Sequence, residues 1–190
     1  MGLQSVKKDV FMSNTTSKKT LIIMVAVFVL PVVLAKLALE NDWFNKASTN
    51  KGALLEPTIN LTTLLEDSSP TWRLLYVMPA QCDSRCENAL FSINQVWLAL
   101  GKESDRAQAL VLATPTSDAN ALASLVDYPN VATLSVDDTA QLAAQSVYVV
   151  DTLNNAMLFY QISDDKEEAV MESRNMLADI KKLLKLSRIG

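Results

Sequence analysis

The apolar run from Thr20 to Leu39 restricts the architecture of this chain more than any other segment. A helix needs roughly 20 residues to cross the hydrocarbon core of a bilayer, and this run is long enough for one crossing. Its one charged residue, Lys36, lies near the end, where a long side chain reaches the headgroups. A cleaved signal peptide typically has a shorter apolar core, about 7–15 residues, and an A-x-A-like site, which is not evident here. We therefore predict a transmembrane helix at residues 20–39.

The charges on either side of this run predict its orientation. The polar segment before it carries four lysines, Lys7, Lys8, Lys18 and Lys19. The first charged residues after it are acidic, Glu40 and Asp42. Because positive charge stays in the cytoplasm, residues 1–19 are predicted to be a loose cytoplasmic tail and the rest of the chain to be exported. Trp43 and Phe44 fit an aromatic anchor at the far interface of the membrane.

The remaining residues suffice for one domain. Residues 40–57 are polar and are interrupted by glycine and proline, which is typical of a linker. Residues 58–190 match the usual length of a single domain with its own core. The formal net charge of −4 and the pI near 4.9 argue against a nucleic acid as partner, since phosphate binding requires an excess of clustered Lys and Arg.

The chain contains no histidine. This absence removes Ser-His-Asp and Cys-His catalysis, and also zinc or copper sites that use imidazole ligands. Two cysteines, Cys82 and Cys86, are then the main candidates for reactive groups. A disulfide between them would close a very short loop and stabilise little by chain entropy, so a purely structural role would use them poorly.

The hydrophobic pattern of residues 58–190 alternates strands with helices. Short apolar runs predict strands at 72–78, 109–113, 131–136, 147–150 and 156–162. Helical spacing predicts helices over 84–100, from Ser117 or Asp118 to about 126, and over 166–188. The pair Asn154-Asn155 tolerates the left-handed backbone of a hairpin turn between the last two strands. This order of elements, with its hairpin before the closing helix, is that of the thioredoxin fold.

The cysteines flank the start of the helix predicted at residue 84. Ser84 and Glu87 match the S-x-x-E capping box, which makes Ser84 the expected N-cap. Cys82 then lies in the loop before the helix and Cys86 in its first turn, near the same face, so that the two thiols can meet. The pair is therefore placed for disulfide chemistry.

Two effects on the thiols oppose each other. The unpaired N–H groups of the helix start and the cation of Arg85 favour thiolate, which is both a nucleophile and a metal ligand, whereas Asp83 and Glu87 disfavour it. An inert local disulfide in an oxidising compartment is the alternative.

Methionine thioethers would also suit Cu(I) as soft ligands, although methionines on apolar faces usually fill the core. The candidates are Met157, Met171 and Met176.

Several segments resemble a known family. Trp72 to Cys86, W-R-L-L-Y-V-M-P-A-Q-C-D-S-R-C, resembles the strand, loop and C-x3-C motif of the Sco/SenC thioredoxin-like copper proteins. Residues 95–106, 147–160 and 179–190 resemble the small membrane-anchored thioredoxin-like proteins encoded in bacterial cytochrome c oxidase assembly clusters. The resemblance covers most of residues 70–190.

The resemblance implies a bacterial inner-membrane protein with a periplasmic domain that helps to mature the copper-containing oxidase. Its implied partners are the copper-binding subunit of cytochrome c oxidase or the assembly factors of that subunit. The domain would either reduce the subunit's cysteines or pass copper to them, and Cys82 and Cys86 match the Sco cysteines. The family's third copper ligand, a histidine, has no counterpart here.

Three functions are therefore expected from sequence. In thiol–disulfide exchange, Cys82 is the accessible attacking thiol and Cys86 the resolving thiol. In the alternative, Cys82 and Cys86 carry Cu(I) together with an unidentified third ligand. A non-catalytic assembly scaffold is the third reading. The chain lacks the proline that thioredoxins usually place just before the strand starting at Val147, opposite the dithiol.

Overall fold

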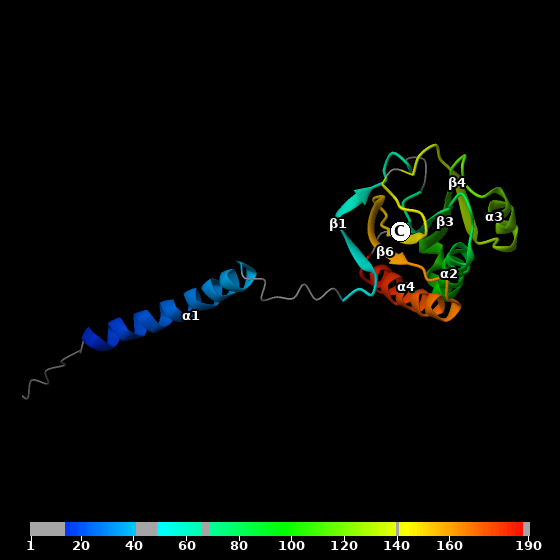
Figure 1. Cartoon of the computed structure of the whole chain (residues 1–190). Coiled ribbons are helices and arrows are strands. Elements are labelled where there is room, and N and C mark those ends of the chain that lie inside the picture. Colours follow the sequence, from blue (N-terminus) through cyan, green and yellow to red (C-terminus); the bar gives the residue numbers. More distant parts are fainter. Residues whose placement is uncertain (1–13, 41–48, 66–68, 140, 188–190) are drawn as a thin grey trace, which may run out of the picture. The chain divides into compact units, whose positions relative to one another are not determined.

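The computed structural model describes residues 14–40, 49–65, 69–139 and 141–187 (Figure 1). The chain divides into two compact units, Met1–Ala47 and Ser48–Gly190. The predictions made for residues 1–13, for Trp43 and Phe44, and for residue 188 lie outside the described residues.

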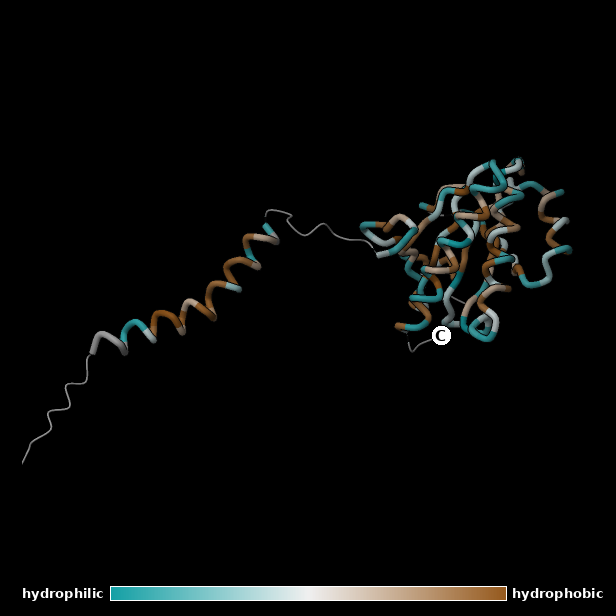
Figure 2. The backbone as a smooth tube through the Cα atoms, turned by 90° about the horizontal axis from the view of Figure 1, so that it is seen from below, coloured by the Kyte–Doolittle hydropathy of each residue, from teal (hydrophilic) through white to brown (hydrophobic). Residues whose placement is uncertain are grey.

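In the first unit the described residues, 14–40, form one long helix, α1 (Asn14–Glu40). Its segment Lys18–Ala38 has a mean hydropathy of 2.8 and is long and apolar enough to cross a membrane; in Figure 2 the hydrophobic colour covers most of this helix. Pro31 lies within it, as is tolerated in membrane helices. Lys36 and Glu40 are paired at 3.7 Å, one turn apart. The helix predicted at 20–39 is thus present and begins earlier.

The second unit is built on one mixed sheet in the order β1-β6-β5-β2-β3-β4. The strands are β1 (Ala53–Asn60), β2 (Trp72–Val77), β3 (Ala107–Ala113), β4 (Val131–Ser135), β5 (Ser146–Val150) and β6 (Asn155–Gln161). β2, β3 and β4 run parallel, whereas β5 is antiparallel to β2 and β6. β2 is therefore central, and its six residues are all buried.

Side chains alternate across β2 and feed two apolar layers. Leu74, Tyr76 and Met78 join a cluster formed with the helices, and Leu75 and Val77 join a second cluster on the other face. The helices are α2 (Ser84–Leu100), α3 (Ala119–Ser124) and α4 (Lys166–Leu186), with short 3-10 turns at Gly101–Arg106 and Leu125–Asp127. α2 and α4 lie side by side (Figure 1). The thioredoxin-like fold predicted from sequence is confirmed.

Residues 53–57, which we expected in the linker, belong to the domain. They form the first part of β1, which pairs with β6 in register Ala53↔Phe159 through Asn60↔Asn155. The strand carries Pro57 and exposes most of its side chains, which is characteristic of an edge strand. The ordered domain therefore starts before residue 58.

A buried carboxylate fastens the start of the domain to α4. Asp179 is 2% exposed, and its Oδ2 accepts hydrogen bonds from the backbone N–H of Lys51 at 2.7 Å and of Gly52 at 2.9 Å. The Tyr160 hydroxyl donates to the same oxygen at 2.6 Å. A Cβ at Gly52 would lie 2.4 Å from the Tyr160 ring, so the chain passes too close for a side chain. We call this arrangement the Asp179 clamp.

Candidate functional site

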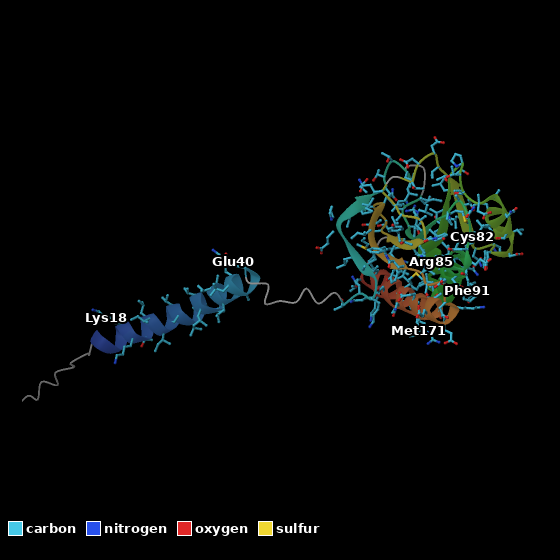
Figure 3. All side chains as sticks on the ribbon, in the orientation of Figure 1. Lys18, Glu40, Cys82, Arg85, Phe91 and Met171 are labelled. Atoms are coloured by element: carbon cyan, nitrogen blue, oxygen red, sulfur yellow. A yellow bond between two sulfur atoms is a disulfide. The ribbon has the colours of Figure 1, made fainter. Side chains whose placement is uncertain are left out.

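Cys82 and Cys86 form a disulfide between the loop after β2 and the first turn of α2. Their Cα atoms are 5.2 Å apart, within the usual range for disulfides of about 4.4–6.8 Å. Cys86 is fully buried, whereas Cys82 is partly exposed. Figure 3 labels Cys82 and Arg85 in this part of the domain. An incoming group can therefore reach the Cys82 sulfur more easily than the Cys86 sulfur.

The N-cap of α2 is Asp83, not Ser84 as the capping-box pattern predicted. The Asp83 Oδ1 accepts a hydrogen bond from the backbone N–H of Cys86 at 3.0 Å, and the Asp83 carbonyl accepts from the N–H of Glu87. A carboxylate is a strong cap for these N–H groups, so it takes the position one residue earlier. Cys86 is consequently the third residue of the helix, with its backbone held by the cap.

The other cysteine is held by Asp118, at the start of α3. Its Oδ2 accepts a hydrogen bond from the backbone N–H of Cys82 at 2.9 Å, while its Oδ1 caps α3 by accepting from Asn120 and Ala121. These hydrogen bonds, that from Cys82 first, lower the pKa of the Asp118 carboxyl. Asp118 was expected only as a helix cap, and sequence gave no signal that it also fixes the Cys82 loop.

The Met78 thioether lies beside the disulfide. Its Sδ is 3.7 Å from the Cys86 Sγ, in a buried contact. The Met78 N–H donates to Leu112 at 3.0 Å, and its carbonyl accepts from the Ser117 hydroxyl at 3.0 Å. Both sides of the Met78 backbone are thus fixed.

The thioethers singled out from sequence occupy other positions. Met157 and Met176 pack in the helix-side core, with Met176 fully buried, and Met171 is 53% exposed and accepts a hydrogen bond from Arg174. Met78 could have been found from its position in the sequence, because it directly follows the strand and lies four residues before Cys82.

Gln145 lies two residues before Val147, close to where thioredoxins usually place a proline that this chain lacks. Its φ of 67° is left-handed, and its Oε1 accepts a hydrogen bond from the Arg85 guanidinium at 3.1 Å. Its amide nitrogen reaches Asp83 at 3.5 Å. A groove of about 430 Å³ runs beside this contact, lined by Arg85 and residues 143–146 and 161–163. The groove therefore lies next to the first turn of α2.

Two polar atoms near the disulfide are buried and, among the described residues, have no hydrogen-bond partner. They are the Tyr76 hydroxyl and the Arg85 Nε. Burial raises the pKa of the Tyr76 phenol; Asp83 raises it further and Arg85 lowers it, so the phenol lies within electrostatic reach of these two residues, which are part of the segment between the cysteines. A buried donor without an acceptor costs about 1–3 kcal/mol, so this region does not reach the lowest free energy its polar groups allow.

The site offers sulfur rather than nitrogen or oxygen to a metal ion. Within the described residues, no group of three or more Cys, Asp or Glu side chains is placed to hold one. After reduction, two thiolates and one thioether would stand together at Cys82, Cys86 and Met78. Such soft donors match Cu(I). The site can therefore exchange disulfides, or hold a soft ion when reduced.

Comparison with known proteins identifies the domain. The family model described as transmembrane-like, thioredoxin-like, C-terminal domain matches residues 72–187. The copper-bound ScoI of Bradyrhizobium japonicum is similar at 18% identity and a TM-score of 0.40, over 57% of this chain and 87% of that one. The copper-bound ScoI of Arabidopsis thaliana is similar at 12% identity and a TM-score of 0.44, over 62% and 88%.

A further solved structure comes from a protein named for thiol chemistry. The putative thiol:disulfide interchange protein DsbE of Chlorobium tepidum is similar at 13% identity and a TM-score of 0.42, over 68% of this chain and 94% of that one. No curated protein matches the chain.

Proposed function

We propose that this chain, which belongs to the family of transmembrane-like, thioredoxin-like C-terminal domains, is a membrane-tethered thiol–disulfide exchange protein that assists cytochrome c oxidase assembly. The observation that carries the proposal is the asymmetry of the disulfide. Cys82 is partly exposed in a loop and Cys86 is buried in the first turn of α2. An exchange centre needs one sulfur that partners can attack and one that only its neighbour reaches.

The exchange proceeds through a mixed disulfide. The Cys82 thiolate attacks one sulfur of a disulfide in the target, and the other target sulfur leaves as a thiolate that takes up a proton. Cys86 then gives up its proton and attacks the Cys82 sulfur, which re-forms the Cys82–Cys86 disulfide and releases the second target thiol. Two electrons pass to the target, and a reduced dithiol protein must return them to this domain. The target is the copper-binding subunit of the oxidase or one of its assembly factors.

Trapping the mixed disulfide tests this function. Cys86→Ser leaves Cys82 able to attack but removes the thiol that resolves the intermediate, so the variant should accumulate a covalent complex with its target in cells. Cys82→Ser should trap nothing, because the remaining thiol is buried. Both variants should lower the copper content of the oxidase. A normal copper content of the oxidase in both variants, without a trapped complex, would contradict thiol–disulfide exchange and favour the non-catalytic scaffold.

We also propose that the N-terminus is cytoplasmic and the domain periplasmic, at the bacterial inner membrane. The lysines before the apolar helix and the acidic residues after it support this orientation. In a variant with both native cysteines replaced by serine, single reporter cysteines at Ser13 and at Val126, which is 81% exposed, separate the two sides. An impermeant thiol reagent should label only residue 126; labelling of residue 13 alone would reverse the orientation.

A second candidate function, transfer of Cu(I) as cargo, is favoured by the sulfur donors at the site. Two thiolates suit Cu(I), whereas Cu(II) prefers nitrogen or oxygen donors, and the chain has no histidine to supply them. Two Cu(II) ions should therefore oxidise the dithiol to the disulfide, leave as Cu(I), and release the two thiol protons to water. A persistent thiolate-to-Cu(II) absorption band with both cysteines unbridged would contradict this reasoning.

A further inference from the structure

We propose that Met78 is the third ligand of a Cu(I) site formed with Cys82 and Cys86 when the disulfide is reduced. The inference rests on the Cu(I) candidate function and names the ligand that its chemistry needs. The observation behind it is the buried contact of 3.7 Å between the Met78 Sδ and the Cys86 Sγ.

That separation suits a shared metal ion. Metal–thiolate bonds are roughly 2.3 Å long, so three sulfurs arranged in a triangle around one ion lie roughly 4 Å from each other. Met78 and Cys86 already stand near this distance. Reduction frees the Cys82 sulfur from its bond to Cys86, and the Cα separation of 5.2 Å keeps Cys82 close enough to complete the triangle.

Hydrogen bonds hold the backbone at all three positions. Met78 is bonded on both sides, to Leu112 and Ser117. The Cys82 N–H is held by Asp118 and the Cys86 N–H by Asp83. A ligand set whose backbone is fixed before the ion arrives loses little conformational entropy on binding. The site is therefore built to accept an ion with small side-chain adjustments.

Charge and burial also fit a monovalent soft ion. Binding Cu(I) releases the two thiol protons, so the loaded site carries a net charge of one negative unit without any change of oxidation state. The N–H groups at the start of α2 and the Arg85 cation favour an anion there, and the Asp83 and Glu87 carboxylates oppose it. Met78 and Cys86 are 2% and 0% exposed, which shields the ion from water, while the partly exposed Cys82 is the side from which an acceptor can take it.

The test measures Cu(I) affinity and the ligand atoms separately. The full chain in detergent is reduced, freed of reductant and titrated anaerobically with Cu(I) against a chromogenic chelator. Met78→Leu conserves apolar volume and is compared with Met176→Leu, a matched change at another fully buried methionine of the same core. X-ray absorption at the copper edge of selenomethionine-labelled protein then detects selenium only where a methionine binds copper.

We expect the wild type and Met176→Leu to bind one Cu(I) with a selenium neighbour. Met78→Leu should lose the selenium signal and bind at least tenfold more weakly, since even indirect partners of metal ligands change affinity about 10–100-fold. Tight binding without selenium, together with unchanged affinity in Met78→Leu, would overturn the role of Met78 and leave the Cu(I) function intact. No stoichiometric binding by the wild type would overturn both, and would leave thiol exchange untouched.

Discussion

The Asp179 clamp and the dithiol site are two buried polar regions of one domain, and they treat their hydrogen bonds in opposite ways. At the clamp, one carboxylate oxygen collects three donors within 2.9 Å. Near the dithiol, the Tyr76 hydroxyl and the Arg85 Nε are buried without a partner among the described residues. The carboxylate of the clamp is fully used as an acceptor, whereas these two polar atoms near the dithiol have no partner among the described residues. Substitutions in the two regions should therefore differ in kind.

The largest loss of stability is expected at the clamp. Asp179→Ala leaves three donors without their acceptor, two of them from the backbone, and should lower the free energy of unfolding by about 3–5 kcal/mol. Asp179→Asn keeps one acceptor oxygen and should lose less. Denaturation of the full chain in detergent, followed by tryptophan fluorescence, to which buried Trp72 contributes, measures both. A loss below about 1 kcal/mol for Asp179→Ala would show that the clamp contributes little.

The two buried tyrosines provide a direct contrast. Tyr160→Phe removes the donor to Asp179 and should cost about 2 kcal/mol, since hydrogen bonds to charged groups contribute about 1.5–3 kcal/mol. Tyr76→Phe removes a hydroxyl that has no described partner, so the unfolding free energy should stay within about 0.5 kcal/mol or rise slightly. The same denaturation assay decides; equal costs for both variants would mean that Tyr76 is satisfied by a group such as a bound water.

The disulfide should contribute little to folding. It closes a loop with a sequence separation of 4, for which the chain-entropy model gives at most about 2 kcal/mol. Reduced and oxidised wild type should therefore both be folded and differ by no more than that amount in denaturation. The variant with both cysteines replaced by serine serves as the control that cannot respond to reductant. Unfolding on reduction would make the pair a structural staple.

The smallest expected effect is on the stability of the protein at acid pH, through the Asp118 carboxyl. The pKa of this carboxyl is lowered in the folded protein from its ordinary value of 3.8, chiefly by the Cys82 N–H. Its contribution to stability is therefore full above about pH 4 and is lost as pH falls through the folded pKa. Asp118→Asn should flatten the decline in stability of the wild type below about pH 4. Identical pH profiles for the two proteins would show that the Asp118–Cys82 contact carries no charge-dependent stability.

Sequence reasoning located the regular elements because each carries its own periodicity. The strand at 72–78 and the helix over 84–100 appear as β2 and α2 almost unchanged. β1 was not predicted because it contains Pro57 and most of its side chains are exposed, so it lacks the apolar pattern of a buried strand. Its partner β6 also lies far along the chain. Asp83 was not predicted as the N-cap because the S-x-x-E capping-box pattern begins one residue later and favoured Ser84.

The sequence predicted the position of the site better than the set of residues that surround it. The two cysteines stood out by spacing, but the contact of Met78 with Cys86 depends on how α2 docks on the end of β2. Gln145 and Asp179 read as ordinary polar residues of a loop and an amphipathic helix, and only the folded chain shows their bonds. Long-range contacts of this kind leave no periodic trace in a single sequence.

The reduction potential of the Cys82–Cys86 pair tests the central claim most directly. The full chain in detergent is equilibrated with dithiol buffers of known potential. The fraction of protein with free Cys82 and Cys86 thiols is then measured by alkylation. Structural disulfides usually lie below about −300 mV. A redox centre of the kind described here should lie well above that value, because the Cys82 sulfur is partly exposed and exposed disulfides have higher potentials. A potential below about −300 mV would contradict the account and make the disulfide inert.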